Sequence, residues 1–481
     1  MSKDISCVNV DDPELAALFR PFALKMEQQG LPAIVINTFK CYFNQFLYGA
    51  QGKFSDRDVM PVDEQELADY DAMDKFKPLG ERTLHKTAVI KLNGGLGTSM
   101  GLESAKSLIP VKDGLSFLDL ILLQATNIRT HYGVDFPQIF MNSFKTHMDT
   151  MLKVGSFNNG DTGIDLAFLQ HRYPKILAKD HSPASWPQNP ELEWNPPGHG
   201  DIYTAMITSG ILDALLDRGY EYAFISNSDN LGAIMNRRLL GYMVHNKLPF
   251  LMEVARRTEQ DKKGGHLCRL RKNKQLALRE VAQCPDKEMD SFCDINKFKF
   301  FNTNSIWVDL RILQSVFVSH RMMPLDLIIN PKTLDPRDPN SPKVFQLETA
   351  MGSAITNFLN AQAVIVPRKR FAPVKTTADL LQVMSDCFVR TERDTITPNP
   401  IRTTPMPRIV LDQKFYKKID MFLGRFPKTP PSLLECSSLT IEGDVRFEDN
   451  IRCTGDVRIV NDGPEQAVIP TGSVLAGEIT F

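Results

Sequence analysis

Short apolar runs alternate with segments of helical spacing from about residue 87 onward, and this alternation constrains the fold more than any other feature. In the first half of this region, strands are expected at 87–92, 138–141, 166–169 and 222–225, and helices at 117–125 and 205–216. Strands that alternate with helices predict a mostly parallel sheet with helices packed on it. Ligands of such sheets bind at the carboxyl ends of the strands, so the loops that follow the strands are where a site is expected.

The second half of the region continues this pattern with one interruption. Residues 266–270 and 276–281 flank the turn-like residues 272–274 and predict a hairpin appended to the sheet. The alternation resumes at 301–310 and is followed by a helix near 347–359, a strand at 363–366 and a helix near 377–388.

The two ends of the chain depart from the α/β pattern and predict three parts. Residues 1–82 contain two stretches of helical periodicity, 13–26 and 33–47, and are interpreted as a helical extension packed on the core. Residues 83–395 form the expected catalytic domain, and a Pro-rich link opens the last part, 396–481. There, Gly-Asp-Val-Arg begins at Gly443 and recurs 12 positions later at Gly455, which favours a parallel β-helix over a hairpin with a chance repeat.

Charge and composition exclude several classes of protein. The chain has 56 Lys and Arg residues against 57 Asp and Glu, which argues against nucleic acid or an acidic membrane surface as a partner. No apolar run approaches the ~18 residues that cross a bilayer, and the first residues lack the pattern of a secretory signal. The eight cysteines are scattered and form no C-x-x-C pair, so free thiols in a reducing cytoplasm are expected.

The run from Lys91 to Lys106 is the most informative local motif. It follows a predicted strand and contains four glycines, at positions 94, 95, 97 and 101. Glycines let backbone N–H groups approach an anion closely. The run matches neither a P-loop nor the dinucleotide fingerprint, and a flexible surface loop is the alternative. The preceding strand and the basic residue nine positions beyond Gly97 favour a phosphate cradle.

Lys91-Leu-Asn-Gly-Gly-Leu-Gly-Thr-Ser-Met-Gly closely resembles the signature loop of the UTP–glucose-1-phosphate uridylyltransferase family, also called UDP-glucose pyrophosphorylases. Further blocks resemble that family in order: 196–203, 224–232, 263–265, 301–304, 346–350 and 370–375. The resemblance covers roughly residues 85–480. It implies a Rossmann-like α/β nucleotidyltransferase fold of GT-A-like type, with a mixed, mostly parallel sheet and a left-handed parallel β-helix at the C-terminus.

The resemblance implies the reaction UTP plus glucose 1-phosphate giving UDP-glucose plus pyrophosphate, by in-line attack on the α-phosphate. Such a step needs positioning and positive charge rather than a general base, because the attacking phosphate is already a dianion. By resemblance Lys375 is the catalytic lysine, and Lys106 contacts the UTP phosphates as a second catalytic cation. A solvated surface lysine is the alternative for each.

Mg²⁺ is the expected cofactor, held by Asp229 after the predicted strand 222–225. Mg²⁺ is typically bound through one or two carboxylates together with substrate phosphates, so a single aspartate suffices. The alternative is an Asx turn that caps the strand. By resemblance the neighbouring Asn227 and Ser228 contact the sugar phosphate or the ribose.

The remaining site residues are assigned to the two substrates. The amide of Gln170 can accept from uracil N3–H and donate to the adjacent carbonyl, which would reject CTP. By resemblance Gly198 lies against uracil and His199 against the sugar phosphate. The UTP contacts implied are Leu92, Asn93, Gly94, Gly95, Lys106, Gln170, Gly198 and Lys375; the hexose contacts are Gly265, Glu280, Asn302 and Asn304.

The chain departs from the family pattern at Ala105, where eukaryotic members usually have proline, and this favours a bacterial member with a looser loop. In eukaryotic relatives the end of the tail helps to build oligomers, so a homo-oligomer through the C-terminal β-helix is a further expectation. Two rival functions stay open. One is a uridylyltransferase for galactose or N-acetylglucosamine 1-phosphate, and the other is a non-catalytic sugar-nucleotide-binding homologue.

Overall fold

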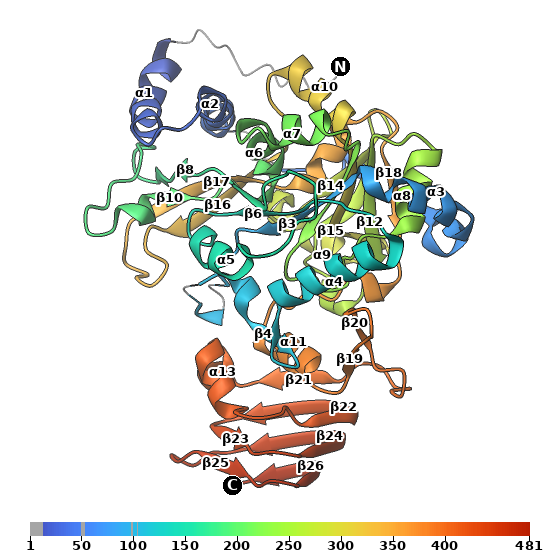
Figure 1. The fold of residues 1–481 in the computed structure, drawn as a ribbon. Coiled ribbons are helices and arrows are strands. Elements are labelled where there is room, and N and C mark those ends of the chain that lie inside the picture. The colour runs from blue at the N-terminus through green and yellow to red at the C-terminus, as the bar shows by residue number, and fades with distance from the viewer. Residues whose placement is uncertain (1–12, 50–52, 98–99, 103) are drawn as a thin grey trace.

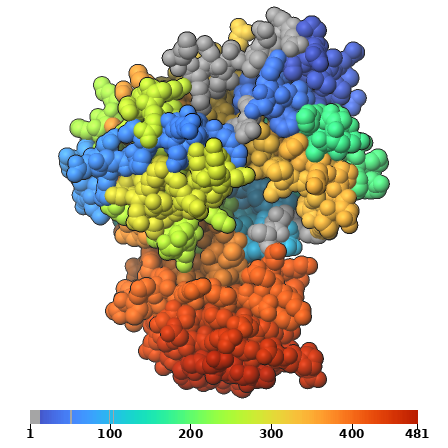
Figure 2. Space-filling view, turned by 180° about the vertical axis from the view of Figure 1, so that it is seen from behind, coloured from blue at the N-terminus to red at the C-terminus, as the bar shows by residue number. Residues whose placement is uncertain are grey.

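The structure is a computed structural model of the 481-residue chain, and it describes residues 13–49, 53–97, 100–102 and 104–481. An α/β body occupies one end of the molecule and a stack of parallel strands projects from it at the C-terminal end (Figures 1 and 2). The helices are α1 Pro13–Gln28, α2 Ala33–Leu47, α3 Lys77–Thr83, α4 Phe117–Tyr132, α5 His147–Val154, α6 Ile202–Thr208, α7 Ile211–Asp217, α8 Arg237–His245, α9 Met289–Cys293, α10 Leu310–His320, α11 Thr377–Met384, α12 Gln413–Tyr416 and α13 Ile419–Arg425. None of the described helices is both long enough and apolar enough to cross a membrane.

A central sheet confirms the predicted mixed, mostly parallel α/β architecture. Its main path runs β2 Ala68–Asp69, β18 Gln362–Ile365, β12 Phe250–Arg256, β15 Phe300–Asp309, β11 Tyr222–Asn227, β3 Thr87–Asn93, β6 Gln138–Asn142 and β7 Ala167–Leu169. Strand β15 is antiparallel to both neighbours, and the other pairs on this path are parallel. The hairpin of β13 His266–Leu270 and β14 Leu276–Arg279 joins the sheet through β15, as expected.

Helices cover both faces of this sheet, because successive side chains of a strand point to opposite sides. Ala88 and Ile90 of β3 pack into the cluster that contains residues of α6, α7 and α10. Val89, between them, packs into the cluster that contains residues of α4 and α8. Every residue of β3 is buried, which is typical of a central strand in a sheet covered on both faces.

The expected helix at 205–216 is two helices. Helix α6 ends at Thr208 and α7 begins at Ile211, with Gly210 between them at φ 75°. A left-handed residue cannot continue an α-helix, and glycine adopts this conformation without steric strain. The apolar periodicity therefore spans a break that the side-chain pattern does not reveal.

The prediction of a helix near 347–359 is also wrong. Strand β17 Lys343–Thr349 occupies its first part, and a 3₁₀ turn over Met351–Asn357 occupies the rest. Strand β17 is paired on both sides, by β16 Leu327–Thr333 and by β9 Ile176–Leu177. Pairing with segments distant in sequence overrides the local pattern.

The first 82 residues are not only helical. Helices α1 and α2 pack on a small strand region, where the rings of Phe39 and Tyr173 lie 4.9 Å apart between centroids. Strand β1 Val59–Met60 pairs with β13, and β2 adds a strand to the edge of the central sheet. The polar stretch after α2 therefore contributes strands that its composition did not predict.

The remaining short strands form four small pairings at the periphery: β4 Pro110–Lys112 with β5 Leu115–Ser116, β8 Tyr173–Pro174 with β10 Trp194–Asn195, β19 Phe388–Arg390 with β20 Ile396–Pro398, and β23 Val445–Phe447 with β25 Ala467–Ile469. The helix expected near 377–388 ends at Met384, where α11 gives way to β19.

The C-terminal strands stack in parallel in the order β21 Arg408–Leu411, β22 Ser432–Glu442, β24 Arg452–Val460 and β26 Val474–Thr480 (Figure 1). Stacked partners are not the two copies of the Gly-Asp-Val-Arg repeat. Ile441 pairs with Ile459, 18 positions later, whereas Val445 pairs with Ala467 in a separate two-stranded sheet. The 12-residue repeat thus places its two copies in two different sheets. Apolar residues of α11 share one core with these strands.

Candidate active site

Several of the predicted site residues lie at the carboxyl ends of parallel strands of the central sheet. Leu92 and Asn93 end β3, and Asn227 ends β11 opposite Leu92. Gln170 follows the last residue of β7 directly, and its backbone N–H donates to the Asn142 carbonyl at the end of β6 (2.8 Å). The structure therefore brings together residues separated by more than 100 positions at one edge of the sheet, where ligands of such sheets bind.

The glycine-rich loop folds back on itself beyond β3. Lys106 N–H donates to the Gly95 carbonyl (3.1 Å), and Gly97 has φ 58°. An ideal Cβ at Gly94 would lie 2.6 Å from Gln170 Nε2, so only glycine lets this amide lie so close to the loop. Thr98 and Ser99 of the motif lie outside the described residues.

Two other residues of this region have their polar groups already engaged. The side chain of Asn93 is buried and donates to Asn142 Oδ1 and Thr150 Oγ1, both at 2.8 Å. Its amide therefore holds the end of β3 rather than facing a ligand. Ala105 is fully buried and its N–H approaches Asp149 Oδ2 (3.4 Å), a hydrogen bond that proline could not donate.

Lys106 and Asp229 form an ion pair of 2.5 Å between Nζ and Oδ2, with both side chains mostly buried. The other carboxylate oxygen, Oδ1 of Asp229, is buried and has no hydrogen-bond partner. An unsatisfied buried acceptor costs about 1–3 kcal/mol, and more when it is charged. A hard divalent cation such as Mg²⁺ prefers this type of donor, so the residues present fit that ion.

The segment that carries Lys375 is held against the Asp229 turn by backbone contacts. Val374 N–H donates to the Asp229 carbonyl (3.3 Å), and Pro373 forms a bridge with Asn230. Asn230 accepts from Ala372 N–H (3.0 Å) and donates to the Arg370 carbonyl (3.2 Å) through its side chain. The exposed Lys375 side chain therefore begins one residue beyond the contact with Asp229.

Asn230 is a positioning residue to which the sequence reasoning assigned no role. It lies inside a block of family resemblance, which was the only available signal. The segment that carries Lys375 is also held by the buried ion pair of Arg370 and Glu253, with Nε–Oε2 at 2.6 Å and Nη2–Oε1 at 2.7 Å. Glu253 also accepts from Trp307 Nε1 (2.9 Å), and nothing local in the sequence marks it.

The Pro-Pro-Gly-His-Gly loop contributes Gly198 and His199. Gly198 has φ 78°, and an ideal Cβ there would lie 2.4 Å from the Thr349 carbonyl oxygen, so this position requires glycine. His199 Nδ1 accepts from Met351 N–H (3.1 Å), and burial lowers the pKa of His199 to about 4. The ring is therefore neutral near pH 7 and carries its proton on Nε2, which can donate to an anionic ligand.

The four predicted hexose contacts lie near one another: Gly265 precedes β13, Glu280 follows β14, and Asn302 and Asn304 lie in the first half of β15. Asn302 N–H donates to the Gly265 carbonyl (3.0 Å), and Asn302 Nδ2 donates to Asn304 Oδ1 (2.8 Å). An ideal Cβ at Gly265 would lie 2.4 Å from a Glu280 carboxylate oxygen. Burial raises the pKa of Glu280 to about 7, and the charge of Lys375 opposes this shift. The Lys375 ammonium is therefore close enough to Glu280 to favour the charged form of that carboxyl.

Glu280 makes stability depend on pH in the absence of ligands. Its folded pKa lies above the unfolded value, so the stability present below about pH 4.5 is lost as pH rises through about 7. We expect Glu280→Gln to leave the unfolding free energy nearly unchanged at pH 5 and to raise it by about 1–3 kcal/mol at pH 8. Urea unfolding of both proteins at the two pH values measures this difference. Equal differences at pH 5 and pH 8 would contradict the shifted pKa.

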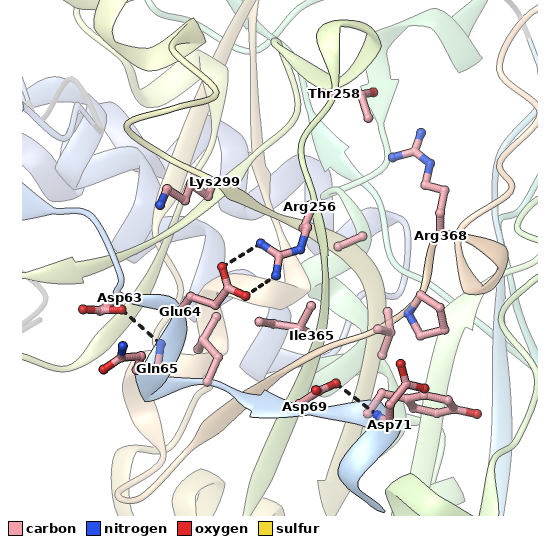
Figure 3. A pocket seen from close by; sticks show the side chains of 15 residues that line it. Asp63, Glu64, Gln65, Asp69, Asp71, Arg256, Thr258, Lys299, Ile365 and Arg368 are labelled. Atoms are coloured by element: carbon pink, nitrogen blue, oxygen red, sulfur yellow. Dashed lines mark hydrogen bonds and ion pairs between the residues drawn. The ribbon is translucent and has the colours of Figure 1, made fainter. Parts of the chain in front are cut away.

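A separate cavity of about 880 Å³ lies at the carboxyl ends of β2, β12 and β18 (Figure 3). Its charged side chains are mixed in sign, and Glu64 and Arg256 form a two-pronged ion pair across it. Arg368 lies on its wall and pairs with Asp261 (2.8 Å). None of the predicted site residues lines this cavity, so it is distinct from the site described above.

Comparison with known proteins relates this geometry to one family. A sequence profile of the UTP–glucose-1-phosphate uridylyltransferase family matches residues 36–454. The chain is 42% identical to the enzyme of that name from Solanum tuberosum over 413 residues, which is 84% of each chain.

Solved structures of the same family resemble this chain in both sequence and fold. A mutant UDP-glucose pyrophosphorylase from Leishmania major in complex with UDP-glucose is 41% identical, with a TM-score of 0.88, and the alignment covers 96% of this chain and 99% of that one. A Trypanosoma brucei relative is 40% identical, with a TM-score of 0.87, over 97% of this chain and 100% of that chain. These relatives are eukaryotic and give no support to a bacterial origin. The match over most of the chain, in sequence and in fold, shows that this protein belongs to the UTP–glucose-1-phosphate uridylyltransferase family.

Proposed function

We propose that the protein makes UDP-glucose and pyrophosphate from UTP and glucose 1-phosphate, by Mg²⁺-dependent in-line attack of the sugar phosphate on the α-phosphate. The observation that carries the proposal is the convergence of Lys106, Asp229 and Lys375 at one edge of the sheet. Lys106 pairs there with Asp229, whose other carboxylate oxygen is buried and unsatisfied, and the backbone segment that carries Lys375 contacts the same turn. Family membership and the relatives' names support the same reaction.

The chain supplies charge and position rather than a nucleophile. The loop after β3 offers backbone N–H groups of Gly94 and Gly95 to the UTP phosphates. Lys106 neutralises those phosphates, and Lys375 holds the attacking phosphate against the α-phosphate while negative charge spreads in the transition state. The sugar phosphate is a dianion near neutral pH, so no side chain has to remove a proton from it.

Mg²⁺ would be held by Asp229, with substrate phosphates and water as its other ligands. Among the described residues no three His, Cys, Asp or Glu side chains form a ready-made cage, so phosphate oxygens would complete the site. When bound, the ion neutralises phosphate charge. Because Asp229 Oδ2 pairs with Lys106 in the free protein, the same carboxylate would link the metal and the loop lysine.

Specificity would come from three groups of residues around this centre. Gln170 and Gly198 would contact uracil, with further UTP contacts from Leu92 and from the main chain of Asn93. His199, Asn227 and Ser228 would bind the sugar phosphate, with His199 donating from Nε2. The hexose would be bound by Gly265, Glu280, Asn302 and Asn304.

A pyrophosphate-release assay with UTP, Mg²⁺ and a panel of sugar 1-phosphates tests the function. We expect glucose 1-phosphate to be preferred over the galactose and N-acetylglucosamine analogues by at least about tenfold in kcat/KM, because buried hexose contacts would be left unpaired by the wrong sugar. Preference for an N-acetyl sugar would contradict the glucose assignment. Absence of pyrophosphate release with every sugar would instead support a non-catalytic homologue.

We further propose the three-part organisation 1–82, 83–395 and 396–481, with the last part a left-handed parallel β-helix. The parallel pairing of β22 with β24 supports the coil. A homo-oligomer through this coil is supported by exposed apolar residues near its end, including Val474 and Phe481. A cytoplasmic location is supported by the free thiols of Cys268, Cys284, Cys293, Cys387, Cys436 and Cys453. Cys7 lies outside the described residues.

A further inference from the structure

We infer that Asp201, acting through His171, positions the amide of Gln170 and thereby sets the preference of the enzyme for UTP over CTP. Neither Asp201 nor His171 has a part in the reaction proposed above. The inference rests on that proposed function, because it concerns the nucleotide half of the same site. Asp201 and His171 are positioning residues in it, since neither is required to touch the substrate.

The Asp201 carboxylate holds both the main chain and the ring of His171. Oδ2 accepts the His171 backbone N–H at 2.6 Å, and both carboxylate oxygens lie within 2.9–3.0 Å of Nδ1. On the far side of the ring, Thr208 Oγ1 lies 2.9 Å from Nε2. The side chains of Asp201 and His171 are 2% and 8% exposed, so water does not weaken these bonds.

This clamp fixes the peptide that follows Gln170. The N–H of Gln170 donates to Asn142 (2.8 Å), and the next N–H, of His171, donates to Asp201. With the backbone held on both sides, the Gln170 side chain lies against Gly94, where its amide nitrogen would be 2.6 Å from an ideal Cβ. An amide that reads a base edge is selective only while its donor and acceptor are held in place.

Asp201 also reaches the second predicted uracil contact. Its backbone N–H donates to the Gly198 carbonyl (3.3 Å), which closes the tight turn of the Pro-Pro-Gly-His-Gly loop. Gln170 and Gly198 come from different loops, and Asp201 joins them by its side chain and its main chain. His199 lies in the same turn, but its ring is held by a separate hydrogen bond from Met351 N–H, which does not involve the Asp201 side chain. The nucleotide contacts can therefore be disturbed while the sugar-phosphate contact is retained.

Asp201→Asn tests the inference, because asparagine keeps the size of the side chain but offers one acceptor oxygen in place of two. We expect the KM for UTP to rise about tenfold and the ratio of kcat/KM for UTP over CTP to fall about tenfold. The KM for glucose 1-phosphate should change by less than about threefold, since Met351 still holds His199. Asp217→Asn, at an exposed aspartate at the end of α7, is the matched control, and thermal melting reports whether the fold is intact.

The outcomes separate positioning from mere stabilisation. A folded Asp201→Asn protein with the UTP-to-CTP ratio of the control overturns the inference, and so does a parallel loss for both nucleotides at an unchanged ratio. If Asp201→Asn does not fold, Thr208→Val decides, because it removes only the hydroxyl at Nε2. We expect that variant to lower the same ratio about two- to fivefold, and an unchanged ratio contradicts the inference.

Failure of the proposed function is recognised separately. If the wild-type protein releases no pyrophosphate from UTP and glucose 1-phosphate, the reaction is wrong. Calorimetric affinities for UTP and CTP of the wild-type and Asp201→Asn proteins then still test the positioning. Equal UTP-to-CTP affinity ratios in the two proteins overturn it.

Discussion

Replacing Lys375 by alanine is expected to lower kcat by about 10²–10³ while the protein stays folded. The Lys375 side chain is exposed, so its removal leaves no cavity in the core. The backbone N–H of residue 375 donates to Asp379 Oδ2 at 2.9 Å, and the variant keeps this hydrogen bond. The charge is lost at the point where the transition state spreads negative charge over the reacting phosphates. A preorganised cation is more stabilising there than in bulk water, so the loss should fall on kcat more than on either KM.

Steady-state pyrophosphate release and a thermal melt measure this prediction together. Lys369→Ala is the matched control, because Lys369 is an exposed lysine on the neighbouring 3₁₀ turn Arg368–Arg370. The control should keep near-normal turnover and the same melting temperature. Turnover within about threefold of wild type in Lys375→Ala would remove the lysine from the mechanism.

Asp229→Asn is expected to lower turnover by at least about 10²-fold and to shift the Mg²⁺ requirement to higher concentration. The carboxylate carries the buried Oδ1 that lacks a partner, and its other oxygen pairs with Lys106 at 2.5 Å. An amide is a weaker ligand for Mg²⁺, and it leaves the lysine without its anion. The substitution therefore removes both the proposed metal ligand and the ion-pair partner of Lys106.

The measurement is a Mg²⁺ titration of activity at saturating substrates, together with direct Mn²⁺ binding in the presence of UTP. Mn²⁺ prefers similar oxygen ligands, so its binding reports on the site independently of turnover. Asp217→Asn, with its exposed side chain, should behave like wild type in both assays. An Asp229→Asn protein with an unchanged titration midpoint and unchanged Mn²⁺ affinity would contradict the metal assignment.

Strands β3, β6, β7 and β11 could be predicted because each is a short apolar run whose burial follows from its own composition. The glycine-rich loop and the lysine beyond it could be singled out for a similar reason, since they are adjacent in sequence, whereas their roles as phosphate contacts rest on the family resemblance. The antiparallel direction of β15 could not be predicted, because it depends on which strands lie on either side of it. The break at Gly210 and the strand β17 were missed for the same kind of reason, since backbone conformation and pairing overrode an apolar pattern.

The sequence by itself determined the chemical inventory of this protein: a glycine-rich loop with a lysine beyond it, and a carboxylate and an amide that each follow a strand. The second lysine, Lys375, was indicated by the family resemblance. Only the tertiary structure decided their partners. Asp229 meets Lys106 across 123 positions, and His171 meets Asp201 across 30. Periodicity reports which face of a local element is buried, whereas these hydrogen bonds depend on how distant elements pack together. That packing left one buried oxygen of Asp229 without a partner and tied Gln170 to Gly198 through a single aspartate.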